Sequence, residues 1–354
     1  MLEKLRIKNF KSHKDTELCL NKLTLLVGTN SSGKSSIIQG LLLIIHNITN
    51  ENSSPLNGHL ISVGNLNEVC NYITNANEFE LLVKSKDEEV GLKFMPSERN
   101  GIDTDVSFTN SSDELKEYLN YANNKVHYLS ANRIGGQDLY NKNFDKYDVF
   151  GLHGEYAIDY FQSHKTDLID EDLVKNKDSQ TLEGQVDYWL ELFFGQKLLT
   201  TSISGTDKVK AEYKLPFGRN IRPKNTGSGI SYLISILIIC LSSKPDDLII
   251  IENPEIHLHP KAQSNLTDFL LFISSKNRQL IVETHSDHLF NGVRVGVIKN
   301  KITASDVNII FCKLADDYTT DNTHITLSDR GKIETAIPDL FDQFSIDLKT
   351  LVGF

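Results

Sequence analysis

The sequence has few cysteines, and they are scattered. The four residues Cys19, Cys70, Cys240 and Cys312 form no C-x-x-C pair. This spacing argues against a zinc site and against a disulfide framework. A reducing, cytoplasmic compartment fits the pattern.

Long apolar runs are also lacking. The longest, at 37–45 and 230–241, are shorter than the roughly 20 residues that a membrane helix needs. We therefore expect buried helices and no membrane partner. The opening residues 1–4 lead directly into an alternating segment, so no secretory signal is expected.

The chain has no basic excess, because its formal net charge is −10. A protein that coats nucleic acid needs a Lys or Arg at each phosphate contact, so this class is disfavoured. The densest basic stretch is Lys4, Arg6, Lys8, Lys11 and Lys14. A solvated strand edge is its simplest interpretation, with a nucleotide or nucleic-acid contact as the alternative.

A glycine-rich segment between an apolar run and a helix-like stretch indicates nucleotide chemistry. Residues 23–27 predict a buried strand, and a helix is predicted from Lys34 to about residue 45. Between them lies a G-x-x-x-x-G-K-S phosphate loop in the context that it requires. The loop residues expected to bind ATP are Gly28, Asn30, Ser31, Ser32, Gly33, Lys34, Ser35 and Ser36.

The chemistry of this loop explains its residue types. Its backbone N–H groups and the helix N-terminus would surround a phosphate. Lys34 would reach the β- and γ-phosphates, and Ser35 would be a ligand of Mg²⁺. ATP and Mg²⁺ are therefore the expected cofactors.

Two further apolar strands end in polar residues. Residues 248–251 lead into Glu252, a Walker B pattern that predicts a second contact to Mg²⁺, direct or through water. A core strand with a solvated acidic turn is the alternative. Residues 279–282 lead to His285, which could contact the γ-phosphate or orient the attacking water. A lone histidine is more often structural.

A Gly-Ser-Gly segment precedes the apolar helix predicted at 231–241. Gly227, Ser228 and Gly229 lie about 20 residues before the acidic strand. Glycines at a helix N-terminus make an anion-binding nest, although a plain helix cap is the alternative.

The remaining patterns divide the chain into three parts. The first, 1–135, carries the phosphate loop and a hairpin at 79–83 and 90–95. The second, 136–205, is expected to be a mainly helical insertion. The third, 206–354, carries the acidic strand, with further strands at 309–314 and 325–327. Residues 47–57 are expected to form a loop, and no heptad run predicts a long coiled coil.

The order of these motifs resembles the ABC-type ATPase heads of the SMC, RecF and OLD group. The resemblance implies an α/β P-loop ATPase head. The opening 5–12 looks like the first strand of that group, which lies beside the adenine, so Lys11 and Ser12 are implied ATP contacts. A closer resemblance, to Septu PtuA-like anti-phage defence ATPases, is carried by residues 128–135, 151–156, 255–260 and 338–343.

The resemblance also implies partners. Two heads of this group sandwich ATP between the phosphate loop of one and Ser228-Gly229 of the other, so a homodimer or higher homo-oligomer is expected. ATP-driven assembly would then regulate a separate effector nuclease, with an HNH-type enzyme as one candidate. A DNA-repair or DNA-tethering ATPase is the alternative.

One residue departs from the family pattern. ABC heads usually carry a Glu directly after the Walker B acid as general base, and here that position is Asn253. An amide can position water but cannot accept its proton. Either Glu255 or another group is the base, or hydrolysis is slow and the chain is an ATP-sensing scaffold. His257 and His259 form an H-x-H pair, but no third metal ligand is evident.

Overall fold

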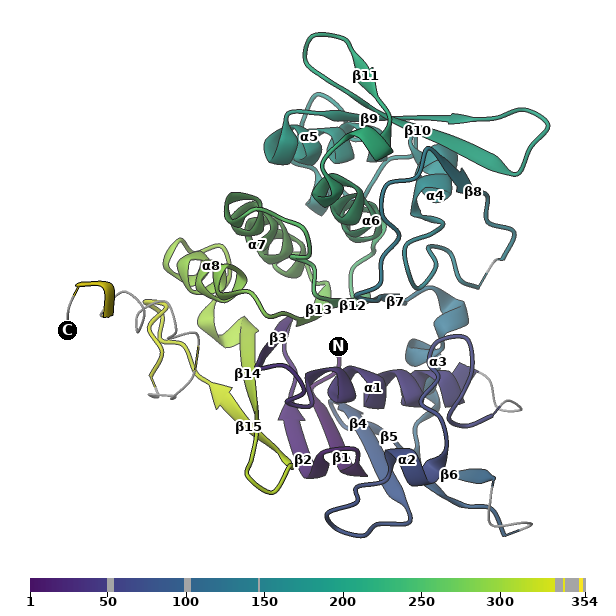
Figure 1. Ribbon diagram of the computed structural model, residues 1–354, viewed down its shortest axis with the longest axis vertical. Coiled ribbons are helices and arrows are strands. Elements are labelled where there is room, and N and C mark those ends of the chain that lie inside the picture. Colours follow the sequence, from purple (N-terminus) through teal and green to yellow (C-terminus); the bar gives the residue numbers. More distant parts are fainter. Residues whose placement is uncertain (50–53, 99–102, 146, 335–339, 341–349, 353–354) are drawn as a thin grey trace.

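A six-stranded mixed sheet forms the centre of the computed structural model, which describes residues 1–49, 54–98, 103–145, 147–334, 340 and 350–352 (Figure 1). Its strands in spatial order are β15 (Thr320–Ile325), β14 (Val307–Leu314), β3 (Leu23–Gly28), β13 (Gln279–Glu283), β12 (Leu248–Glu252) and β7 (Val126–Leu129). All neighbours are parallel except β14 and β15. The phosphate-loop strand β3 is thus separated from the acidic strand β12 by β13.

The central sheet is buried on both faces, which explains its apolar strand sequences. Leu25 and Ile249 belong to a core shared with the helices α5 (Leu182–Phe194), α6 (Ser228–Ser242), α7 (Pro260–Ser274) and α8 (Asp287–Ile298). Leu26 and Ile250 point into a second core on the opposite face. Successive residues of each strand therefore stabilise two different layers.

The second core lies between the central sheet and an antiparallel sheet, with α1 (Lys34–Thr49) between them (Figure 1). This outer sheet has the order β2-β1-β4-β5-β6. Its strands are β1 (Lys4–Phe10), β2 (His13–Cys19), β4 (Phe79–Ser85), β5 (Glu88–Pro96) and β6 (Thr104–Ser111). The predicted hairpin is confirmed as β4 and β5, and the short helices α2 (Leu66–Val69) and α3 (Asp113–Leu119) complete this lobe.

The middle segment contains less helix than expected. Besides α4 (Ala157–His164) and α5, it holds an antiparallel sheet in which β10 pairs with three other strands. These strands are β8 (Leu139–Asn141), β9 (Lys197–Ser202), β10 (Lys208–Lys214) and β11 (Asn220–Ile221). β8 and β11 are too short to show a sequence period, and the sheet extends beyond the predicted boundary at residue 205.

Two boundaries and one helix differ from the sequence prediction. Helix α1 continues to Thr49, so residues 47–49 are not loop, because Ile48 is buried in the second core. The last strand is 320–325 rather than 325–327, and Leu327 makes only an isolated bridge with Ile333. Helix α8 was not predicted. Of the segment 338–343, only Leu340 lies within the described residues.

No helix in the described ranges is long and apolar enough to cross a membrane.

Candidate functional site

The phosphate loop connects β3 to α1 through backbone conformations that favour glycine. Gly28 has φ +142° and Gly33 has φ +95°. A Cβ at Gly28 would lie 2.1 Å from the Cys312 carbonyl oxygen, and one at Gly33 would lie 2.3 Å from Thr320 Oγ1. Only glycine fits at these two positions. The loop conformation therefore depends on close contacts with distant residues as well as on the loop's own sequence.

Lys34 is almost fully buried at the first turn of α1, with 3% of its surface exposed. Its Nζ donates hydrogen bonds to the carbonyl oxygens of Gly28, at 3.0 Å, and Thr29, at 2.5 Å. Burial lowers the pKa of this ammonium group, and the nearby Glu283 and Glu255 oppose the change. The lysine is thus folded back across the loop where a phosphate would be bound.

A pocket of about 290 Å³ opens over this loop. The residues that line it are Ser12, Asn30, Ser31, Ser32, Gly33, Lys34, Ser35, Ser36, Glu283 and His285. The structure therefore brings together most of the predicted ATP contacts. Lys11 does not line this pocket, and its Nζ donates to Gln39 Oε1 at 2.5 Å.

Two residues that the sequence did not indicate contact the backbone carbonyl oxygens of the phosphate loop. Thr320 Oγ1 donates to the Ser32 carbonyl at 3.0 Å and lies 2.6 Å from Ser12 Oγ. His13 is fully buried, and its Nε2 lies 3.1 Å from the Gly33 carbonyl oxygen. Neither residue belongs to a recognisable motif, because each side chain contacts the backbone of a loop that lies far from it in the sequence.

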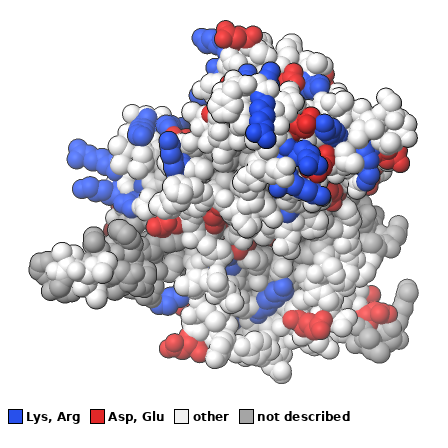
Figure 2. All heavy atoms as spheres, turned by 45° about the horizontal axis from the view of Figure 1, so that its top comes forward, with Lys and Arg blue, Asp and Glu red and all other residues white. Residues whose placement is uncertain are grey.

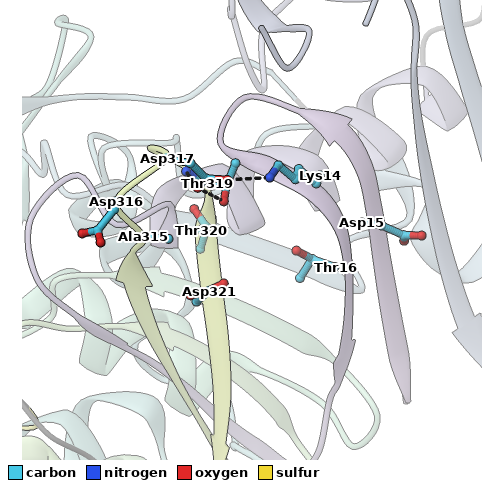
Figure 3. Close-up of a pocket in the computed structure, with 9 residues that line it drawn as sticks. All are labelled: Lys14, Asp15, Thr16, Ala315, Asp316, Asp317, Thr319, Thr320 and Asp321. Carbon is cyan, nitrogen blue, oxygen red and sulfur yellow. Dashed lines mark hydrogen bonds and ion pairs between the residues drawn. The ribbon is translucent and has the colours of Figure 1, made fainter. Parts of the chain in front are cut away.

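Thr320 begins β15 beside a second, acidic pocket (Figure 3). There Lys14 Nζ lies 2.6 Å from Asp317, whose pKa the neighbouring lysine and Thr319 lower to about 2. The ion pair joins the turn before β15 to the start of β2.

The Ser35 hydroxyl donates to Glu283 Oε1 at 2.8 Å. Glu283 ends β13 and is 3% exposed, and its other oxygen, Oε2, is buried with no partner among the described residues. Burial raises the pKa of this carboxyl to about 7, and the negative charges of Glu252 and Glu255 act in the same direction. A hydroxyl and a free carboxylate oxygen suit Mg²⁺, which takes few protein ligands besides phosphates and water.

Glu252 lies beside Glu283 in the parallel register but has other partners. Its Oε1 accepts from the Tyr128 hydroxyl at 3.1 Å, and its Oε2 accepts from the Ala131 N–H at 3.0 Å. Glu252 does not line the phosphate-loop pocket. The acid in hydrogen-bond contact with Ser35 is therefore Glu283, while a contact of Glu252 to Mg²⁺ stays a prediction.

Arg133 holds the backbone that follows the acidic strand in place. The sequence did not indicate this role. Its guanidinium is buried and donates to the carbonyl oxygens of Glu252 and Asn253, each at 2.6 Å, and of Ser130, at 3.0 Å. Burial lowers its pKa to about 10, so the group stays charged at neutral pH. Arg133 is a positioning residue for the turn that carries Asn253.

Asn253 and Glu255 lie at this turn, and His285, which follows β13, contacts Glu255. Asn253 has φ +43°, and its side-chain oxygen is buried without a partner among the described residues. Glu255 Oε1 accepts from the His285 N–H at 2.8 Å, and burial raises the pKa of Glu255. Partial burial and the charge of Lys34 lower the pKa of His285. A neutral imidazole could orient water or a phosphate oxygen.

The Gly-Ser-Gly segment begins α6 away from the phosphate-loop pocket. Gly227 and Ser228 are exposed, and Gly229 is buried. None of the three lines the pocket. A Cβ at Gly229 would lie 2.7 Å from the His257 carbonyl oxygen, so the start of α6 packs closely on the loop after β12.

The H-x-H pair has structural partners. The His257 ring lies 4.6 Å from the Tyr232 ring, and His259 is the N-cap of α7. Across the described ranges, no group of three His, Cys, Asp or Glu residues could hold a metal ion.

Four of the five N-terminal basic residues, all except Lys11, form ion pairs with acidic neighbours. Lys4 pairs with Glu17 at 2.8 Å and Arg6 with Asp15 at 2.7 Å. Lys8 lies 3.7 Å from Glu80. Figure 2 shows basic and acidic side chains intermixed at the upper right of one face, while basic side chains predominate at its left. These pairs favour the solvated strand edge over a nucleic-acid contact.

A family model matches residues 70–291, and its description is "AAA domain, putative AbiEii toxin, Type IV TA system". The chain belongs to this AAA-domain family. The match covers the insertion, the start of α6, β12 and His285, while the phosphate loop lies before it.

Individual relatives of this AAA-domain protein are distant. An OLD nuclease from Thermus scotoductus is 22% identical over 371 residues, covering 95% of this chain and 69% of that protein. A chromosome partition protein Smc from Methanocaldococcus jannaschii is 37% identical over 83 residues, 22% of this chain and 7% of that protein.

Solved structures confirm the predicted fold. An Smc head bound to the C-terminal winged-helix domain of ScpA has a TM-score of 0.56 at 18% identity, with 92% of this chain and 98% of that one covered. An Smc head from Pyrococcus furiosus, bound to the C-terminal domain of ScpA, also has 0.56, at 13% identity with 100% and 99% covered. The AAA-domain protein therefore has the α/β P-loop fold of SMC heads.

Proposed function

We propose that the chain binds Mg²⁺–ATP at the phosphate loop and hydrolyses it. The observation that carries this proposal is the buried Lys34 ammonium, which is held on the carbonyl groups of Gly28 and Thr29 in the lining of the pocket. A buried cation beside a ring of backbone N–H groups and a helix N-terminus is suited to a polyphosphate. On binding, Lys34 exchanges these carbonyl groups for phosphate oxygens.

Other residues near the pocket would bind the metal ion, accept a proton from water and contact the γ-phosphate. Mg²⁺ would neutralise charge on the phosphates, and Ser35 with a nearby carboxylate would hold it. Glu255, buried and hydrogen-bonded to the His285 N–H, would accept a proton from water, since Asn253 cannot. His285 lines the pocket and would contact the γ-phosphate.

We infer that two heads close around ATP. Support comes from the exposed Gly227 and Ser228 at the start of a 15-residue helix, apart from the chain's own phosphate-loop pocket. A helix N-terminus brought to the γ-phosphate by a second copy would bind ATP better in the closed state than in the open one. ATP would then act as the switch for assembly.

The same switch would regulate a separate effector nuclease in anti-phage defence, as the Septu-like motifs imply. The distant OLD relative supports a link to nuclease function, because it is named a nuclease and about a third of it lies outside the match. The test is phage plating on a bacterial host that carries the chain with its operon neighbours. Protection should be lost with Lys34→Ala, and protection that persists with this variant would contradict the ATP switch.

The test of nucleotide chemistry compares wild type with Lys34→Ala and Glu255→Gln. ATP binding is measured by calorimetry, turnover by phosphate release, and mass by light scattering with and without ATP. Lys34→Ala should lose binding. Glu255→Gln should keep binding but lose turnover by about 100-fold or more. Lys244→Ala, at an exposed turn before β12, is the matched lysine control, and an equal loss of binding there would sink the proposal.

A second candidate, an ATP-sensing scaffold with little turnover, is favoured by Asn253 at the usual base position. Wild type would then bind ATP and assemble but release almost no phosphate, and Glu255→Gln would change nothing.

A further inference from the structure

We propose that Glu283 of β13, rather than Glu252 of β12, is the carboxylate that holds Mg²⁺ together with Ser35. This inference rests on the proposed ATP binding, because the metal would arrive with the nucleotide. It assigns a role to a residue that the sequence patterns did not single out.

Strand order provides the first argument. β13 is the direct neighbour of β3, with Glu283 in register with Leu26, whereas β12 is one strand further away. The carboxyl ends of these parallel strands meet at the edge where α1 begins. Glu283 therefore contacts the phosphate loop directly through Ser35, and it lines the loop pocket while Glu252 does not.

The hydrogen-bond partners provide the second argument. Both carboxylate oxygens of Glu252 are engaged, one by the Tyr128 hydroxyl and the other by the Ala131 N–H. Glu283 has one oxygen on Ser35, while the other is buried without a partner among the described residues. An unpartnered buried carboxylate oxygen is costly, and a cation beside it would remove that cost.

The direction of the Ser35 hydrogen bond provides the third argument. The hydroxyl has one hydrogen and two lone pairs. Because the hydrogen points to Glu283 Oε1, the lone pairs remain free for a metal ion in the pocket. Glu283 thus orients the first ligand and offers a second oxygen of its own.

The arrangement also gives Glu252 a different task. Its contacts with Tyr128 and Ala131 join the end of β12 to the segment after β7, and its carbonyl oxygen accepts from Arg133. Glu252 would then hold the turn that carries Asn253 and Glu255. It acts on the site through the backbone, with Glu283 as the residue that meets the metal.

The experiment measures Mn²⁺ binding to the protein with a non-hydrolysable ATP analogue, by electron paramagnetic resonance. Glu283→Gln should weaken Mn²⁺ binding by about 10–100-fold. Glu252→Gln, the matched change on the neighbouring strand, should weaken it much less. Analogue binding without metal should persist in both variants, which shows that the loop remains folded.

The outcomes separate the two proposals. A wild-type chain that does not bind the analogue would refute the proposed function and this inference with it. Analogue binding with Mn²⁺ affinity unchanged in Glu283→Gln, or reduced as much in Glu252→Gln, overturns only the assignment to Glu283. If Glu283→Gln fails to fold, Glu283→Asp keeps the charge but withdraws the carboxylate from Ser35. It should also bind Mn²⁺ more weakly, and wild-type affinity there would overturn the assignment.

Discussion

The hydroxyl of Ser35 and the carboxylate of Glu283 are 2.8 Å apart, which joins the first turn of α1 to the end of β13. The two residues are 248 positions apart in the chain. The bond ties the phosphate loop to the central sheet before any nucleotide is present, and the strength of that tie depends on the proton carried by Glu283.

Stability without metal should therefore depend on pH through Glu283. Its folded pKa is about 7, against an ordinary 4.5, so the folded chain keeps a proton that the unfolded chain has lost. Stability is lost as pH rises from about 4.5 to about 7, by about 3 kcal/mol in all.

The measurement is denaturant unfolding at several pH values in EDTA, with wild type compared to Glu283→Gln. The unfolding free energy of wild type, relative to that of Glu283→Gln, should fall as pH rises over this range and stay constant above pH 7. A constant difference would show that Glu283 titrates normally. The comparison cancels Glu255 and His285, which titrate in both proteins.

Arg133→Lys should destabilise the fold although it keeps the charge. A lysine cannot reach the three carbonyl oxygens that the guanidinium fork now bonds. We expect a loss of roughly 1–3 kcal/mol in unfolding free energy. Arg222→Lys is the control, because Arg222 is exposed and lies 3.6 Å from Asp138 at the surface. Equal effects of the two changes would argue against a role for Arg133 at the turn.

Gly33→Ala should disrupt the phosphate loop. The new methyl group would meet Thr320 Oγ1 at 2.3 Å and His13 Nε2 at 3.0 Å. Gly205→Ala provides the control, since Gly205 also has positive φ but no neighbour within 4 Å. Calorimetry should show ATP binding lost only in Gly33→Ala, and both variants should pay a similar backbone cost. Normal ATP binding by Gly33→Ala would show that the loop can shift to make room.

Gly229→Ala should separate assembly from nucleotide binding. Its methyl group would lie 2.7 Å from the His257 carbonyl oxygen and push the start of α6 away from the loop after β12. ATP should still bind, while the ATP-dependent increase in mass seen by light scattering should be lost. Gly218→Ala is the control, because Gly218 lies in the turn between β10 and β11 with no neighbour within 4 Å, and this variant should assemble normally. Assembly of both variants would remove α6 from the proposed interface.

Local sequence predicted the elements well where one chain segment contains the whole signal. The continuous apolar runs of β3 and β12 follow from burial on both faces, and the glycines at 28 and 33 follow from the turn that they make. The strands of the insertion could not be predicted from local sequence. β8 and β11 have only three and two residues, and both form by pairing with β10.

The site shows the same division. The sequence alone determined the phosphate loop, because eight consecutive residues supply its turn, its N–H groups, its lysine and its hydroxyl. Only the tertiary structure decided which acid faces Ser35, since Glu252 and Glu283 both end apolar parallel strands and look alike in sequence. The order of strands in the sheet places β13 beside β3, and that order is set by packing of distant segments rather than by local residues.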